Sequence, residues 1–204
     1  MGTGKVIGKA TDGPISRYVN RRISMRITKA IIHYNLPLTP NQVSVISFLL
    51  SIIAAALILL GQYLWGGILV QISSIIDGAD GELARALGKA SRLGGLLDSI
   101  FDRLADISII AAIAYEVASI ELAHPTIVLL VSLAALSGDI MVSYLHARGE
   151  ASLGKHPALI GAVPQFASRD VRLFVIFIGL VLGKLLETLV VLAIITYLYV
   201  IAKT

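Results

Sequence analysis

Six apolar segments, each close to the length that crosses a bilayer, dominate this chain and constrain its fold. They cover residues 40–60, 63–87, 91–119, 125–148, 169–182 and 185–201. A helix needs about 20 apolar residues to span the hydrocarbon core of a membrane. The 204 residues are 56% hydrophobic, with a mean hydropathy of +0.85, which leaves too little polar surface for an ordinary soluble domain. The sequence therefore predicts an all-α integral membrane protein with six transmembrane helices.

A basic amphipathic stretch precedes the first apolar segment. Isoleucine or valine recurs every four residues from Ile15 to Ile31, and arginines and a lysine fill the positions between. This pattern is typical of a helix lying on a membrane surface, although a helix docked on a soluble partner looks similar. Thr39 and Pro40 then read as the N-cap and first residue of the next helix. We expect an N-terminal segment over 1–38 and a six-helix transmembrane domain over 39–204.

The positive charges indicate the orientation in the membrane. On one side lie Lys5, Lys9, Arg17, Arg21, Arg22, Arg26, Lys29, Arg85, Lys89, Arg92, Arg148, Lys155, Arg169 and Arg172, whereas the opposite loops carry only Lys184. The positive-inside rule places both termini in the cytoplasm of a multi-pass cell-membrane protein. The start of the chain lacks the apolar core of a signal peptide, and cysteine is absent. Nucleic-acid binding is not expected, because no soluble domain presents the basic residues as one face.

Four aspartates interrupt the apolar pattern. Asp77 and Asp80 are three residues apart near the end of the second segment, and Asp98 and Asp102 are four apart near the start of the third. Each pair falls on one face of its helix, and the short connection makes the two helices antiparallel neighbours. Ionisable groups at membrane depth normally face a polar interior and indicate a functional site. We expect these carboxylates to converge at one cytoplasmic depth, in a polar cavity that opens to the cytoplasm.

Four converging carboxylates need positive charge among them. Oxygen-only ligands favour a hard cation such as Mg²⁺ or Mn²⁺, and a pair of ions suits phosphoryl chemistry. An alternative is a network of salt bridges with Arg85, Arg92 and Arg103. A cation transporter is a second alternative, but it predicts acidic groups recurring towards the far side of the membrane. A nonenzymatic membrane anchor would leave the four carboxylates without a role.

The run DGADGELARALGKASRLGGLLDSIFD resembles the signature of the CDP-alcohol phosphatidyltransferase family. That signature reads D-x2-D-G-x2-A-R, eight residues, then G-x3-D-x3-D, and its fixed positions here are Asp77, Asp80, Gly81, Ala84, Arg85, Gly94, Asp98 and Asp102. The six-segment layout, the preceding amphipathic helix and the TPNQ stretch at 39–42 extend the resemblance over nearly the whole chain. It implies an enzyme that transfers a substituted phosphate group from a CDP-alcohol to an acceptor hydroxyl and releases CMP.

The resemblance also implies roles for individual residues. Asp77, Asp80, Asp98 and Asp102 would hold the metal ions, Mg²⁺ or Mn²⁺, and Asp102 would also be the catalytic base that takes the acceptor's proton. The CDP-alcohol would contact Asn41, Asp77, Asp80, Gly81, Ala84 and Arg85, with Arg85 on the diphosphate. Relatives of this family lead us to expect a homodimer in contact with membrane lipid.

The acceptor is expected among the basic residues between the fourth and fifth segments. Arg148, Arg169 and Arg172, with Lys155, are the candidates for binding an acceptor phosphate, since arginine offers a charge-assisted fork. These residues would alternatively only set topology and contact headgroups. The stretches TDGPISRYVNRRIS and SRDVRLFVIFIG resemble the family members that accept inositol phosphate.

Among those members, the implied reaction joins CDP-inositol to inositol 1-phosphate, giving di-myo-inositol phosphate phosphate. The alternative is a phosphatidylinositol-phosphate or archaetidylinositol-phosphate synthase with a CDP-lipid donor. A cytidylyltransferase domain or subunit that makes the donor is the expected partner.

Overall fold

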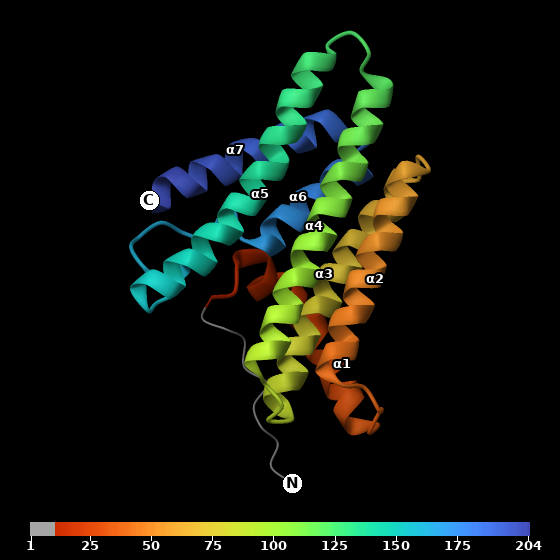
Figure 1. Cartoon of the computed structure of the whole chain (residues 1–204). Coiled ribbons are helices and arrows are strands. Elements are labelled where there is room, and N and C mark those ends of the chain that lie inside the picture. Colours follow the sequence, from red (N-terminus) through yellow and green to blue (C-terminus); the bar gives the residue numbers. More distant parts are fainter. Residues whose placement is uncertain (1–10) are drawn as a thin grey trace.

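Figure 1 shows the computed structural model of the chain, which describes residues 11–204, and all regular structure in that range is helical. The elements are η1 (Ser16–Asn20, a π-helical turn), α1 (Arg21–His33), α2 (Pro40–Leu59), α3 (Tyr63–Ala86), α4 (Arg92–Ile120), α5 (Pro125–Leu153), η2 (Pro157–Leu159, a 3₁₀ turn), α6 (Arg169–Val181) and α7 (Leu185–Lys203). The all-α prediction is confirmed. Lys5 and Lys9, which contributed to the predicted orientation, lie outside the described residues.

The start of α2 shows why the helix boundaries follow the sequence closely. Thr39 is the N-cap: its hydroxyl accepts a hydrogen bond from the backbone N–H of Gln42, and the Gln42 side chain accepts one from the backbone N–H of Thr39. This reciprocal arrangement satisfies two backbone donors that the first turn leaves unpaired. Pro40 occupies the first helical position, where its missing N–H does no harm. The amphipathic helix expected over 15–31 is also present, as η1 and α1.

Among the described helices, α2, α5 and α7 are long and apolar enough to cross a membrane, judged by length and composition. These helices indicate a multi-pass membrane protein. α4 has 29 residues, or about 44 Å at 1.5 Å per residue, and it carries the charged signature at one end. α6 has 13 residues, so it is about 20 Å long and shorter than the hydrocarbon core of a typical bilayer.

The helices form two connected groups (Figure 1). α2, α3 and α4 pack side by side, α5 packs against α7, and α6 joins the groups through contacts with α3 and α7. One apolar core runs through both, with Ile58, Val70, Ile113, Ile176 and Leu189 among its fully buried members. Because α6 begins beside α3 and α4, its first residues reach the same end of the bundle as the signature aspartates.

Two very close helix contacts fix α7 against its neighbours. A Cβ added at Gly179 of α6 would lie 1.7 Å from Thr188 Oγ1, and one added at Gly138 of α5 would lie 2.1 Å from Thr196 Oγ1. Only glycine permits this approach, as is common where membrane helices pack. The contact at Gly179 helps to fix α6, the helix that carries Arg169 at its start.

Candidate active site

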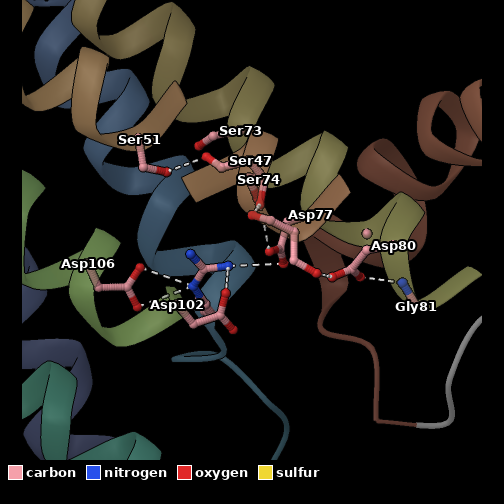
Figure 2. A network of polar contacts seen from close by, with 12 residues as sticks. Ser47, Ser51, Ser73, Ser74, Asp77, Asp80, Gly81, Asp102 and Asp106 are labelled. Atoms are coloured by element: carbon pink, nitrogen blue, oxygen red, sulfur yellow. Dashed lines mark hydrogen bonds and ion pairs between the residues drawn. The ribbon is translucent and has the colours of Figure 1, made fainter. Parts of the chain in front are cut away.

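The end of α3 and the start of α4 bring the four signature aspartates together. The connection is a tight turn in which Gly88 has a φ of +64°, a conformation that side chains disfavour. Ser91 then caps α4, with its hydroxyl accepting from the backbone N–H of Gly94 at 3.0 Å. The helices run antiparallel, so Asp77 and Asp80 of α3 face Asp98 and Asp102 of α4, as the sequence predicted. Figure 2 shows Asp77, Asp80 and Asp102 of this group.

Three of these carboxylates have the geometry of a cation site. Asp77, Asp98 and Asp102 each offer one oxygen, and these oxygens all lie within 4.8 Å of one another. Asp98 Oδ1 is buried and has no hydrogen-bond partner among the described residues. An unpaired buried carboxylate oxygen is unfavourable unless a cation or donor satisfies it. An all-oxygen donor set without histidine or cysteine fits Mg²⁺ or Mn²⁺.

Serine hydroxyls from α2 orient the two aspartates of α3. The Ser44 hydroxyl donates to Asp80, which also accepts from the backbone N–H of Gly81, and Ser47 Oγ lies 3.4 Å from Asp77 Oδ1. Figure 2 shows Ser47, Ser51, Ser73 and Ser74 above the carboxylates, where α2 and α3 pack. Small polar residues allow the two helices to approach closely while still offering donors to the site.

Arg169, at the start of α6, lies among the carboxylates. Its Nη1 is 3.0 Å from Asp77 Oδ2 and 2.8 Å from Asp102 Oδ1, and its Nε donates to both oxygens of Asp106 at 3.0 and 3.2 Å. One guanidinium therefore contacts three carboxylates from two helices (Figure 2). Asp106 also accepts from Arg103 at 3.2 Å and lies 3.7 Å from Arg172.

Two cavities meet at the aspartates. The polar cavity, of about 270 Å³, is lined by aspartates and by Ser16, Arg21, His146, His156, Gln165 and Arg169, among others. The glycine-lined cavity, of about 310 Å³, is lined by Pro40, Asn41, Ala84, Arg85, Gly94 and Gly95, among others. Both linings include Asp80, Gly81 and Asp98. A ligand in each cavity would thus meet the other at the same carboxylates.

The candidate donor and acceptor residues lie in different cavities, and some acceptor candidates line neither. Asn41, Gly81, Ala84 and Arg85, which the sequence assigned to the CDP group, share the glycine-lined cavity. Arg169 lines the polar cavity. Of the other acceptor candidates, Arg172 is buried and pairs with Asp139 at 3.0 Å, whereas Arg148 and Lys155 are exposed. These three lie outside the described linings of both cavities.

The sequence did not predict the polar network that holds α1 against the end of α3, where the first half of the signature lies. Glu82 is almost completely buried and accepts from Arg21 Nη1 at 2.7 Å, Ser24 at 2.7 Å and Thr28 at 2.8 Å, all from α1. Arg21 also donates to both oxygens of Asp12, at 2.9 and 2.7 Å, and to the Gly78 carbonyl at 2.9 Å. Burial opposes the charge of Arg21, but hydrogen bonds to Asp12 and Glu82 raise its pKa above the usual value for arginine.

Two histidines lie on the wall of the polar cavity. His146 of α5 and His156 of the following loop have ring centroids 4.6 Å apart, and His146 Nε2 lies 3.0 Å from the hydroxyl of buried Tyr199. His156 Nδ1 accepts from the backbone N–H of Ala158 at 3.1 Å. His146, His156 and Tyr199 have no regular spacing in the sequence, because they come from α5, the following loop and α7.

Comparison with known proteins identifies a family and a fold. The sequence model described as CDP-alcohol phosphatidyltransferase matches residues 37–202. A "Bifunctional IPC transferase and DIPP synthase" of Rubrobacter xylanophilus is 43% identical over 172 residues, which is 84% of this chain and 37% of that protein. Its namesake in Thermococcus kodakarensis is 47% identical over 133 residues, or 65% of this chain and 29% of that protein. The chain thus spans about a third of the length of these relatives.

Solved structures show the same fold. The crystal structure of Mycobacterium tuberculosis phosphatidylinositol phosphate synthase with CDP-DAG bound has a TM-score of 0.72 and 24% identity, covering 89% of this chain and 92% of that one. The structure of the same enzyme in complex with manganese and citrate has a TM-score of 0.71 and 22% identity, covering 89% and 87%. At this level of identity the similarity concerns the fold.

Proposed function

The chain belongs to the CDP-alcohol phosphatidyltransferase family, and from this we propose that it transfers a substituted phosphate group from a CDP-alcohol to an acceptor hydroxyl, with release of CMP. The observation that carries the proposal is the meeting of the two cavities at Asp80, Gly81 and Asp98. A nucleotide donor in the glycine-lined cavity and an acceptor in the polar cavity would approach one another at the carboxylates. Such proximity is what a transfer between two bound substrates requires.

We assign the donor to the glycine-lined cavity. Asn41, Gly81 and Ala84 line it, and the missing or small side chains of the latter two leave the backbone open to a phosphate. Arg85 lies at the same cavity and would neutralise the diphosphate by its charge. Asp77 and Asp80 would complete the donor site by holding the cations that neutralise the diphosphate.

Asp77, Asp80, Asp98 and Asp102 would hold two divalent cations, Mg²⁺ or Mn²⁺. The bound cations would supply charge stabilisation for the diphosphate and the CMP leaving group. Asp102 lines the polar cavity and would accept the proton of the attacking hydroxyl, for which a carboxylate within hydrogen-bond reach is required. A similar solved enzyme binds manganese, which supports the choice of cation.

We propose a phosphate-bearing acceptor in the polar cavity, with Arg169 as its first phosphate contact. Arg148 and Lys155 are exposed and would attract the anion from solution, and Arg172 would support Arg169 from the interior. The best candidate reaction is CDP-inositol with inositol 1-phosphate, giving di-myo-inositol phosphate phosphate, because relatives named DIPP synthase are 43% and 47% identical. A CDP-lipid donor is the alternative, since a similar enzyme binds CDP-DAG.

The proposed setting is a cell membrane crossed six times, by α2 to α7, with α1 on the cytoplasmic surface. Both termini and the polar cavity would face the cytoplasm, in agreement with the positive charges at that end of the bundle. Residues 1–38 would form the interfacial segment and residues 39–204 the catalytic domain. A homodimer and a cytidylyltransferase domain or subunit are the proposed partners, the latter because the similar relatives are bifunctional.

CMP release by the purified protein tests the function and the donor together. Inositol 1-phosphate and Mg²⁺ are offered with either CDP-inositol or a CDP-diacylglycerol donor, and Asp102→Asn is the inactive control. Release with CDP-inositol alone would support the soluble product, and release with the lipid donor alone would support a phospholipid synthase. Absence of CMP release with every donor and acceptor pair, from folded protein, would contradict the transferase.

A further inference from the structure

We propose that Asp106, which lies outside the family signature, is a positioning residue that holds Arg169 at the border between the metal carboxylates and the polar cavity. This inference rests on the proposed function, in which Arg169 contacts the phosphate of the acceptor. Asp106 is only 2% exposed, and its side chain does not line either of the two cavities. Its effect on substrates therefore has to pass through the arginines that it binds.

Three arginine side chains converge on the Asp106 carboxylate. Arg169 Nε lies 3.0 Å from Oδ1 and 3.2 Å from Oδ2, Arg103 Nη2 donates to Oδ2 at 3.2 Å, and Arg172 Nη2 is 3.7 Å from Oδ2. Arg103 comes from the same helix as Asp106, whereas Arg169 and Arg172 come from α6. One buried carboxylate thus ties the start of α6 to α4 and fixes the direction of the Arg169 guanidinium (Figure 2).

The two edges of the Arg169 guanidinium have different partners. Nη1 contacts Asp77 and Asp102, which belong to the group of oxygens that can hold a cation, whereas Nε contacts Asp106, which does not belong to that group. A divalent cation held by Asp77 and Asp102 would compete with Nη1 for these two carboxylates. The contact of Nε with Asp106 does not take part in this competition.

Asp106 would therefore keep Arg169 in place when the contacts of Arg169 Nη1 with Asp77 and Asp102 weaken. The guanidinium is partly exposed to the polar cavity, so an anion there can replace the carboxylates as its partner. Without the carboxylate of Asp106, the remaining ion-pair partners of Arg169 among the described residues would be Asp77 and Asp102, which belong to the candidate cation site. Arg169 would then offer its charge less effectively to the acceptor phosphate.

The test compares Asp106→Asn with Glu116→Gln, which removes one negative charge from the same helix at the far end, where Glu116 accepts from Tyr63. Inorganic phosphate binding is measured calorimetrically with Mg²⁺ present, and Mn²⁺ binding is measured by electron paramagnetic resonance. Loss of a hydrogen bond to a charged group weakens an interaction by about tenfold or more. We expect Asp106→Asn to raise the phosphate Kd and the acceptor KM about tenfold or more.

The same variant should leave the Mn²⁺ Kd and the donor KM within about threefold, since Asp106 lines neither cavity and is not among the three carboxylates that could hold a cation. Glu116→Gln should leave all four constants within that range. An unchanged phosphate Kd in Asp106→Asn would overturn the proposal. So would loss of Mn²⁺ binding, which would make Asp106 a metal ligand, or an equal effect of Glu116→Gln.

Two further results separate this inference from the proposed function. If the parent protein binds phosphate in an Asp106-dependent manner but releases no CMP with any acceptor, the positioning role stands and the transferase falls. If Asp106→Asn does not fold, Asp106→Glu retains the charge but moves the carboxylate by one methylene. It should raise the acceptor KM several-fold with Mn²⁺ binding retained, and an unchanged KM would contradict the role.

Discussion

Replacing Glu82 by alanine tests whether the α1 network stabilises the active-site end of the bundle. Glu82 accepts three hydrogen bonds from α1, and its side chain is fully buried in an ion pair with Arg21. Removing one partner of a buried pair costs about 3–5 kcal/mol, since the other charge is left uncompensated. Arg21 retains Asp12 and the Gly78 carbonyl, so we expect the low end, about 3 kcal/mol.

For a chain of this size, 1 kcal/mol shifts the Tm by about 2–4 °C, so Glu82→Ala should lower the Tm by about 6–12 °C. The assay is thermal unfolding of the purified protein in detergent. The matched control is Glu187→Ala, which removes an exposed ion pair with Lys184 at 3.4 Å. Both side chains are exposed and solvent screens the pair, so this variant should melt within about 4 °C of the parent. A Tm for Glu82→Ala inside that same range would refute the reasoning.

Three further predictions concern the chemistry. Asp102→Asn should lower CMP release by about 10²–10⁴-fold, the range for loss of a general base, while the donor still binds; residual turnover within tenfold of the parent would remove Asp102 as the base. Chelation with EDTA should stop CMP release, and added Mg²⁺ or Mn²⁺ should restore it; full activity in EDTA would contradict the metal role. Arg85→Gln should raise the KM for the CDP donor about tenfold, as expected for loss of a charge-assisted contact, and leave the acceptor KM unchanged. The reverse pattern would place Arg85 at the acceptor.

The sequence predicted the helices well because the local signals agreed with one another. At Thr39 and Pro40 a capping residue, a proline and the start of an apolar run fall at the same place, and α2 begins there. The predicted segments 63–87, 91–119 and 185–201 match α3, α4 and α7 to within a few residues. The shortness of α6 also follows from the sequence, because Gly183 and Lys184 interrupt the last apolar run.

The polar contacts between distant segments were beyond sequence reasoning. Glu82 occupies a variable position of the signature, and Arg21 looks like any other basic residue of an amphipathic helix, yet the two form a buried pair across 61 residues. A periodic pattern shows which face of a helix is apolar, but it does not show which other helix covers that face. A buried pair between segments so far apart can be found only when both helices are placed.

The four signature aspartates were interpreted either as a metal site or as a network of salt bridges, and the positive groups near them distinguish these two interpretations. A network of salt bridges was expected to use Arg85, Arg92 and Arg103, the arginines nearest in sequence. Among the described ion pairs, Arg103 does contact Asp102 and Asp106, but the other partner is Arg169 of α6. Arg172 lies 3.7 Å from Asp106 and 3.0 Å from Asp139.

The site contains five carboxylates, those of Asp77, Asp80, Asp98, Asp102 and Asp106. They outnumber the arginines that pair with them among the described residues, which are Arg103 and Arg169, with Arg172 at 3.7 Å from Asp106. Because the carboxylates outnumber the arginines, they repel one another in this partly buried site. A diphosphate donor would add further negative charge. Arginine pairing alone leaves this charge uncompensated, whereas two divalent cations would neutralise it and still attract the donor. The charge balance thus favours a divalent-metal site over a structural salt-bridge network.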